Sequence, residues 1–471
     1  MSKSFLGAVA LGTMLAPLNA TMVAVVLSDI AADFGLELRT VSWVLIGYLI
    51  VMAVMQPISG RLGDLMGRRN LFLWAIAGFA LSSIGAALSP NLAVLLAMRV
   101  CMAVTGAVAI PNGIAQLREH APDRNRAAVF GVIGSAAGLA VFLGPLLGGV
   151  MNDAAGWRSI FWLNLPITAA AFYLAYRTFP HRARQPVLSF DLPGAVHLTG
   201  MLSCFALMAY TIGGSSAVIP SVLGIAAAAF AALFVWNELR TLEPLIKMRL
   251  LTIRSYSASL EIVMVSNAMN FGILFAVPLF IKEIRGLDAR DAGYVLSALA
   301  IPVVLIPPFS GRLADKWGRR RPALLGGLLM VCGVAPMMFL QASWSPWLVA
   351  FLLLFVGAGS AMQQPAVQTS SVDSVRPEDA GMASGVFSTG RYVGTIIGTA
   401  VAAALLGSSD AAAVHVTPGR LQAVFMFSTA LGVASTLGCL GLRGRGQMMR
   451  VESLDSAKQP KPARTPSRLD R

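Results

Sequence analysis

The sequence predicts an all-α integral membrane protein of fourteen transmembrane helices, built as two related halves. Of its 471 residues, 56% are hydrophobic and only 12% are charged, whereas a soluble domain has about 25% charged residues. Apolar runs of about 18 to 25 residues recur along the chain, each long enough to cross a hydrocarbon core of about 30 Å. One ten-residue pattern also occurs twice, each time after an even-numbered run.

The apolar runs place the helices to within a few residues. Helices are expected because each one satisfies its own backbone polar groups in lipid, and the runs are too long for barrel strands. The predicted spans are 5–27, 41–60, 70–89, 92–114, 127–151, 160–179, 192–212, 219–237, 257–281, 292–310, 322–342, 346–368, 382–407 and 421–442. The first run is too long for a signal-peptide core, and we expect it to be retained.

The basic residues alternate from one connection to the next. One set of connections, with both ends of the chain, holds 28 of the 36 Lys and Arg, and the alternate connections hold six. This bias predicts that the rich side and both termini are cytoplasmic. The net charge of +14 is then a topology signal rather than a nucleic-acid footprint. The segment 444–471, rich in Pro, Lys and Arg, is expected to be a disordered cytoplasmic tail.

The repeated pattern marks a duplication. The first copy reads Gly60-Arg-Leu-Gly-Asp64-Leu-Met-Gly67-Arg68-Arg69, and the second reads Gly311-Arg-Leu-Ala-Asp315-Lys-Trp-Gly318-Arg319-Arg320. The copies lie eight helices apart instead of six, so two extra helices separate the halves. The predicted units are 1–185, a six-helix bundle; 186–250, two inserted helices and a linker; 251–443, a second six-helix bundle; and the tail.

The two turns are expected to form a conformational latch. Glycines allow close helix approach and a sharp turn, and the aspartates can accept from arginines or cap a helix. The latch residues are Gly60, Asp64, Gly67, Arg68, Arg69, Gly311, Asp315, Gly318, Arg319 and Arg320. The alternative is that the arginines only fix the topology.

These motifs resemble those of the major facilitator superfamily, and in particular its fourteen-helix drug:proton antiporters. The doubled turn carries the resemblance, together with Gly144-Pro145-Leu-Leu-Gly148-Gly149, Trp157-Arg158-Ser-Ile-Phe161, Leu18-Asn19-Ala20-Thr21, Ala380-Gly381-Met-Ala383-Ser384-Gly385 and Glu243-Pro244-Leu245-Ile246. The resemblance implies the major facilitator fold of two six-helix bundles plus two inserted helices, which here would lie in a bacterial inner membrane.

The chain departs from that family at functionally relevant positions. Asn19 stands where relatives usually carry Asp, and Ala24 where they carry Asn. In the fourth helix the Gln-Gly that usually follows the arginine is replaced by Met102-Ala103, and Ala140 replaces a glycine of the fifth. The missing carboxylate at position 19 matters most, because proton chemistry is often placed there in the family.

Two buried arginines are candidates for the substrate or proton pathway. Arg99 and Asn19 lie at similar depth, about 10–12 Å from the outer face, and are expected to meet across the bundle. A buried guanidinium needs partners, so Arg99 either binds substrate and gates transport or caps carbonyls of the first helix. Arg391 is the second buried cation, and Gln363, Gln364 and Gln368 are its expected acceptors.

The ninth helix holds the other pathway candidates. Glu261 is the carboxylate placed inside an apolar run, where burial would favour proton exchange near neutral pH; alternatively it reaches water or pairs with Arg254. Asn267 and Asn270 either line the pathway or hydrogen-bond to neighbouring helices. In the fifth helix Gly144, Pro145, Gly148 and Gly149 are expected to form a hinge or a tightly packed seal.

We expect a secondary active transporter that exports small hydrophobic or amphipathic compounds by alternating access, in exchange for protons. The alternative is a uniporter or dedicated metabolite exporter without proton coupling, which Asn19 favours. No clustered catalytic set or metal-ligand spacing is present, so an enzyme is not expected, nor a metal or other cofactor. The expected partners are a small-molecule substrate and the lipid bilayer, without nucleic acid, and the expected state is a monomer. Two buried arginines favour neutral or anionic solutes over organic cations.

Overall fold

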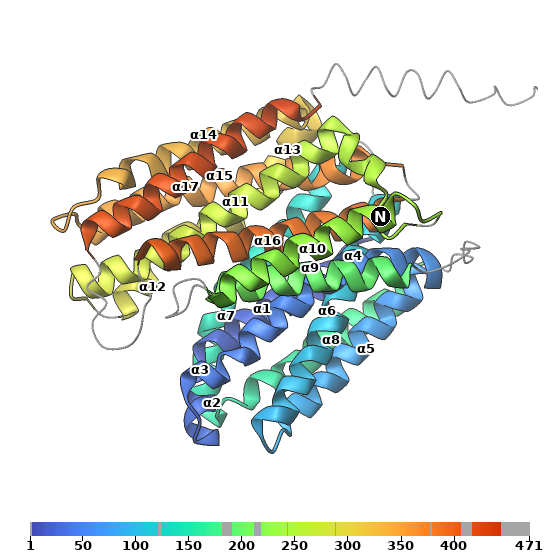
Figure 1. Cartoon of the computed structure of the whole chain (residues 1–471), viewed down its shortest axis with the longest axis horizontal. Coiled ribbons are helices and arrows are strands. Elements are labelled where there is room, and N and C mark those ends of the chain that lie inside the picture. Colours follow the sequence, from blue (N-terminus) through green and yellow to red (C-terminus); the bar gives the residue numbers. More distant parts are fainter. Residues whose placement is uncertain are drawn as a thin grey trace, which may run out of the picture.

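The computed structural model describes residues 2–120, 125–180, 191–211, 218–242, 244–287, 289–376, 379–406 and 417–443. Within these ranges the chain is mostly helical, without strands, and the helices group into two bundles (Figure 1). The tail 444–471, predicted to be disordered, lies outside the described residues, as does Glu243.

The first bundle contains six long helices. They are α1 (Lys3–Val25), α4 (Trp43–Met66), α5 (Arg68–Ala87), α6 (Leu92–His120), α7 (Arg126–Ala155) and α8 (Ser159–Thr178). Two short helices, α2 (Leu27–Phe34) and α3 (Leu38–Val41), connect α1 to α4. One apolar core unites the bundle, in which Phe72, Phe79 and Phe161 are fully buried.

The second bundle repeats this organisation. Its helices are α11 (Arg254–Leu279), α12 (Ala289–Leu305), α13 (Pro307–Trp317), α14 (Arg320–Val334), α15 (Pro346–Asp373), α16 (Ala380–Leu406) and α17 (Pro418–Gly438), with single-turn segments Met248–Thr252, Phe280–Ile284, Ala335–Phe339 and Cys439–Gly441. The α12–α13 pair bends by 46°. Pro307 and Pro308 cause the break because neither has a backbone N–H to continue the hydrogen-bond ladder, so the predicted span 292–310 corresponds to two helices joined at a bend.

The described chain contains thirteen candidate membrane spans, or fourteen if the bent α12–α13 pair is one span. Each is long and apolar enough to cross a membrane. Several helices extend beyond their apolar runs: α4 continues to Met66, and α6 continues to His120. The first turns of each repeated motif are consequently helical, and the chain turns only at Gly67 and Gly318.

The two inserted helices, α9 (Leu192–Thr211) and α10 (Val218–Glu238), pack against each other as a pair beside α4 and α16 (Figure 1). Asp191 fixes one end of the pair. Its carboxylate accepts from the backbone N–H of Gly194 at 2.9 Å, which caps α9, and from the Asn237 amide at 3.0 and 2.9 Å. Most of α10 faces away from the protein, as expected for a helix against lipid.

The bundles meet mainly through two helix pairs, α4 with α16 and α7 with α13. They lie together at the end where the chain begins and diverge toward the other end, where α2 and α3 belong to one bundle and α12 to the other (Figure 1). The contacts that hold the bundles together are thus concentrated at one end.

Candidate functional site

Both repeated turns lie at that same end of the molecule. Gly67 and Gly318 occupy equivalent positions and adopt positive φ values of 87° and 84°, a conformation that side chains with a β-carbon rarely tolerate. We call this the arginine end, defined by Arg68, Arg118, Arg126 and Arg319. The predicted sharp turns are present, and their location on one face agrees with a duplicated bundle.

Asp315 of the second turn caps a helix of the opposite bundle. Its carboxylate accepts from the backbone N–H groups of Ala127 and Ala128 at 3.0 and 2.9 Å. These are first-turn donors of α7, which have no partner within the helix, and a negative charge there is further stabilised by the helix dipole. Asp315 also accepts from Arg319 at 2.7 Å, so the turn itself is held in shape.

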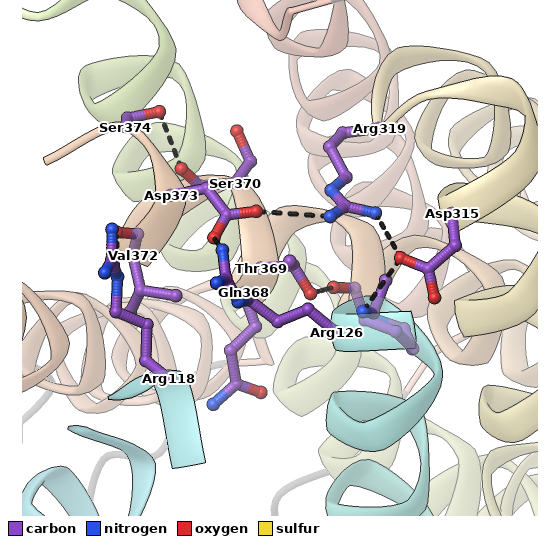
Figure 2. A network of polar contacts seen from close by, with 12 residues as sticks. Arg118, Arg126, Asp315, Arg319, Gln368, Thr369, Ser370, Val372, Asp373 and Ser374 are labelled. Carbon is purple, nitrogen blue, oxygen red and sulfur yellow. Dashed lines mark hydrogen bonds and ion pairs between the residues drawn. The ribbon is translucent and has the colours of Figure 1, made fainter. Parts of the chain in front are cut away.

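Asp373, the last residue of α15, joins this network to a second arginine. Its two oxygens accept from Arg126 at 2.5 Å and from Arg319 at 3.1 Å (Figure 2). Arg126 begins α7, whereas Asp373 and Arg319 belong to the other bundle. All three side chains are at least four-fifths buried, so both ion pairs are poorly screened by water and are of the stronger, charge-assisted type; the Arg126–Asp373 pair crosses the interface.

Arg118 adds a further contact between the first bundle and the end of α15. Its guanidinium reaches from α6 and donates to the carbonyls of Val372 and Val375 at 3.1 and 3.2 Å. Carbonyls at the end of a helix lack partners within the helix, and a cation there complements the dipole. Figure 2 shows Arg118 and Arg126 approaching the end of α15 from the first bundle. The C-terminal end of α15 is therefore bound by two arginines of the opposite bundle.

The first turn makes its observed bonds within its own bundle. Arg68 forms an ion pair with Glu119, and Arg69 donates to the Tyr176 carbonyl at 2.9 Å while lying over the Tyr176 ring. The side chain of Asp64 lies outside the described residues, and Arg320 is exposed. Of the predicted latch, Asp315 thus bonds across the interface, and Arg319 supports Asp315 and Asp373 from within the second bundle.

Beneath the polar network, the bundles touch backbone to backbone at two equivalent places. A β-carbon on Gly60 would overlap the carbonyl of Gly381 in α16, and one on Gly311 would overlap that of Ala127 in α7. One turn further in, Gly385 packs on Gln56, and Gly131 packs on Pro307. The duplicated sequence has therefore produced two duplicate contacts, each built on glycines.

Arg99 and Asn19 meet as predicted. Arg99 of α6 is 1% exposed; it donates to the Asn19 side-chain oxygen in α1 and to the Val44 carbonyl at 3.1 Å. Its guanidinium also lies 4.0 Å from the centre of the Tyr48 ring. The contacts are all neutral, so Arg99 ties α1, α4 and α6 together without an ion pair.

The candidates on α11 divide into two kinds. Asn270 exchanges hydrogen bonds with Ser360 of α15 at 3.1 and 3.2 Å, and Asn267 donates to the Val263 carbonyl at 2.8 Å within its own helix. Glu261 is exposed and lies beside Gly438 of α17. The structure does not bring Glu261 together with Asn19 or Arg99, and its role as a proton carrier stays a prediction.

The glutamines expected to accept hydrogen bonds from Arg391 bond to other residues or face another helix. Gln363 is bound to Ser435 at 3.1 Å and to Cys439 at 3.4 Å, which joins α15 to α17. Gln364 faces Gly134 of α7 across the interface. The Nε and Nη2 atoms of Arg391 are buried without a hydrogen-bond partner. The expected pairing of Arg391 with these glutamines is therefore absent from the described structure.

The glycine–proline segment of α7 packs α7 tightly on α1. β-Carbons on Gly144 and Gly148 would press on Thr21 and on the Met22 backbone, respectively, whereas Gly149 faces open space. The helix continues through Pro145 to Ala155. This arrangement supports close packing at this segment; a hinge motion stays a prediction. Among the described residues there is no group of three metal-ligating side chains.

Comparison with known proteins places this architecture. The family model of the Major Facilitator Superfamily matches residues 9–399 and, in a second match, 260–465. The chain belongs to the major facilitator superfamily. A solved member with the same fold is the proton:xylose symporter XylE, with a TM-score of 0.65 at 15% identity, covering 92% of this chain and 94% of that one.

Two bacterial relatives are similar over most of their length. The MFS-type transporter YvkA of Bacillus subtilis is 34% identical over 443 residues, which cover 94% of this chain and 96% of the relative. The tetracenomycin C resistance and export protein of Streptomyces glaucescens is 30% identical over 406 residues, covering 85% and 75%. The chain is thus a multi-pass membrane protein of a transporter family.

Sequence reasoning missed several residues of the interface. Arg118 and Arg126 were interpreted only as topology charges, and Asp373 lies beyond the predicted span 346–368, in a polar segment without a recognisable motif. Gln56 and Ser388, which are buried without hydrogen-bond partners, were also missed. A polar side chain in the middle of an apolar run was the available signal for the last two.

Proposed function

We propose that this chain exports small hydrophobic or amphipathic compounds across a bacterial inner membrane by alternating access, in exchange for protons. The observation that carries the proposal is the pair of equivalent glycine contacts under one charged network, all at the arginine end. Such an end can separate as two rigid bodies, because each bundle has its own apolar core. The arginine end would be cytoplasmic, consistent with the positive-inside rule.

The tetracenomycin relative supports export of a small organic compound. That relative is a resistance and export protein for tetracenomycin C, and its similarity to this chain spans both bundles. The closed arginine end fits one of the two states that an exporter alternates between, with the substrate site open to the opposite side. A single chain contains both bundles, so we propose a functional monomer.

The experiment is a transport assay with purified protein in proteoliposomes. Substrates are first found by a toxicity screen in a strain that lacks its own exporters. An acidic exterior should then accelerate efflux of the substrate from vesicles that carry the arginine end inside, and collapsing the pH gradient should return the rate to the passive value. Efflux that follows the substrate gradient and ignores the pH gradient would contradict proton exchange.

A second candidate function is favoured by a specific contact. Arg99 binds the neutral side chain of Asn19, which cannot titrate, so this position cannot carry a proton. A uniporter or dedicated metabolite exporter without proton coupling needs no titratable group at this position, in agreement with the neutral Asn19 side chain. The same assay separates the two functions, because only the proton exchanger is driven uphill by an imposed pH gradient.

A further inference from the structure

Three polar side chains whose buried atoms lack hydrogen-bond partners lie between the two bundles, about halfway through the membrane. Gln56 of α4 is fully buried and neither atom of its amide has a partner; Ser388 of α16 is 2% exposed and its hydroxyl has none. Two guanidinium nitrogens of Arg391 in α16, Nε and Nη2, are buried without a hydrogen-bond partner. We call these residues the central polar group.

The packing of α16 on α4 brings the group together. Gly385 sits on the backbone of Gln56, and Thr389 donates to the Ala53 carbonyl at 3.1 Å. Ser388 and Arg391 lie on the following turn of α16. The hydroxyl of Tyr392 also lies close to the Gln56 amide, although no hydrogen bond of good geometry forms between them.

The depth of the group matches that of a substrate site. Arg391 is eleven residues from Ala380 at the start of α16, and Gln56 is ten residues from Met66 at the end of α4. At 1.5 Å per residue both lie about 15–17 Å from the arginine end, near the middle of a 30 Å hydrocarbon core. Sites near the membrane midplane between the two halves are where alternating access exposes a substrate to each side.

The group carries a positive charge that the two helices forming it do not neutralise. The sequence of α16 contains no carboxylate, and that of α4 contains only Asp64, two turns from Gln56. The ring of Phe387, 5.9 Å from the guanidinium, is a weak partner at that distance. Burying a guanidinium without acceptors costs free energy. An anionic group bound beside Arg391 would reduce this cost.

We propose that the central polar group binds the carboxylate or sulfonate of an amphipathic organic anion, which deepens and rests on the proposed function. The planar fork of Arg391 matches the two oxygens of such a group. The Gln56 amide and the Ser388 hydroxyl supply further donors. An organic cation is disfavoured because Arg391 repels it and no carboxylate compensates.

The test is equilibrium binding to the purified full-length protein in nanodiscs. Three probes share one fluorophore and differ in charge: dansylglycine is anionic, dansylglycinamide is neutral and dansylcholine is cationic. The variants are Arg391→Gln, Arg391→Lys, Gln56→Leu and Ser388→Ala. The matched control is Arg240→Gln, because Arg240 is exposed at the end of the inserted helices. Thermal unfolding and gel filtration confirm that each variant is folded.

The unmodified protein and Arg240→Gln should bind dansylglycine more tightly than the other two probes. Arg391→Gln should weaken dansylglycine binding about tenfold or more, as expected for one lost charge-assisted hydrogen bond, and leave dansylglycinamide nearly unchanged. Arg391→Lys should lie between them, while Gln56→Leu and Ser388→Ala should each weaken anion binding less.

Two results would overturn the proposal: no saturable dansylglycine binding to the unmodified protein, or equal loss for all three probes in a folded Arg391→Gln variant. If Arg391→Gln does not fold, the binding of the three probes to Arg391→Lys and Gln56→Leu is compared instead. Equal loss of binding for all three probes in these folded variants would again overturn the proposal. The readout is binding, so selective anion binding without any export would leave this site standing while refuting the proposed function.

Discussion

Gly311 of α13 lies so close to the backbone of Ala127 in α7 that a β-carbon on Gly311 would overlap the Ala127 carbonyl oxygen. Gly60 and Gly381 are related in the same way on the other side of the pseudo-twofold axis. The closed arginine end therefore depends on backbone contact at two points. Any side chain at these glycines must push the bundles apart.

Gly311→Val should prevent close approach of α13 and α7 and shift the protein toward states open at the arginine end. We expect transport in proteoliposomes to fall at least tenfold, because a cycle that cannot close one end is interrupted. Gly149→Ala is the matched control, since that glycine faces open space, and should retain near-normal transport. Normal turnover by a folded Gly311→Val protein would show that the contact is not required.

Asp373→Asn should weaken the network across the interface without changing its volume. Asp373 accepts from both Arg126 and Arg319, and hydrogen bonds to charged groups contribute about 1.5–3 kcal/mol each. Because all three side chains keep some exposure, we expect a net shift of about 1.4 kcal/mol, or tenfold, toward the open arginine end. Spin-label distances between the bundles measure this population; an unchanged distribution would show that Asp373 does not hold the arginine end closed.

Asn19→Asp should form an ion pair with Arg99 where the protein now has a neutral hydrogen bond. A titratable group then enters the core of the first bundle, and transport should acquire an additional dependence on pH. Glu261→Gln tests the predicted proton role of Glu261, and transport by this variant should lose part of its pH dependence. Initial rates from pH 5.5 to 8.5 test both variants; an unchanged pH dependence in a folded Glu261→Gln protein would remove Glu261 from the proton pathway.

Asp33→Asn should reduce thermal stability slightly without affecting transport. The pKa of Asp33 is lowered below its usual 3.8, first by the hydrogen bond from Arg158 and then by that from Trp157. A lowered folded-state pKa contributes stability above pH 3.8 that is lost as the pH falls through the folded value. The difference in melting temperature should thus be constant at neutral pH and shrink in acid. A difference that grows in acid would contradict this assignment.

The sequence predicted what depends on hydropathy and on repetition. Fourteen spans, with the bent pair counted as one, and the two turns at Gly67 and Gly318 follow from apolar length and glycine spacing, and both are present. The meeting of Arg99 with Asn19 followed from equal depth in two helices. These features depend on local composition or on distance along a helix axis, which a sequence states directly.

The remaining features depend on how helices rotate against each other. The acceptors of Gln363 proved to be Ser435 and Cys439, because α15 turns that side chain toward α17. Asp373 became a bridge because α7 happens to begin beside the end of α15. The Pro307-Pro308 pair in the sequence indicates a bend, whereas the length of the apolar run predicts one continuous helix. Helix rotation and packing require three dimensions.

During transport the arginine end should open and close as the two bundles move. Spin labels on exposed Asn70 of α5 and Lys316 of α13 report that end, and labels on exposed Asn91 and Gln341 report the opposite end; Cys101, Cys204 and Cys332 are replaced, and buried Cys439 is retained. Electron–electron double resonance should reveal two distances for each pair, with the short distance at one end accompanying the long distance at the other as substrate is added. A single, unchanging distance at the arginine end in a protein that still transports would contradict the account.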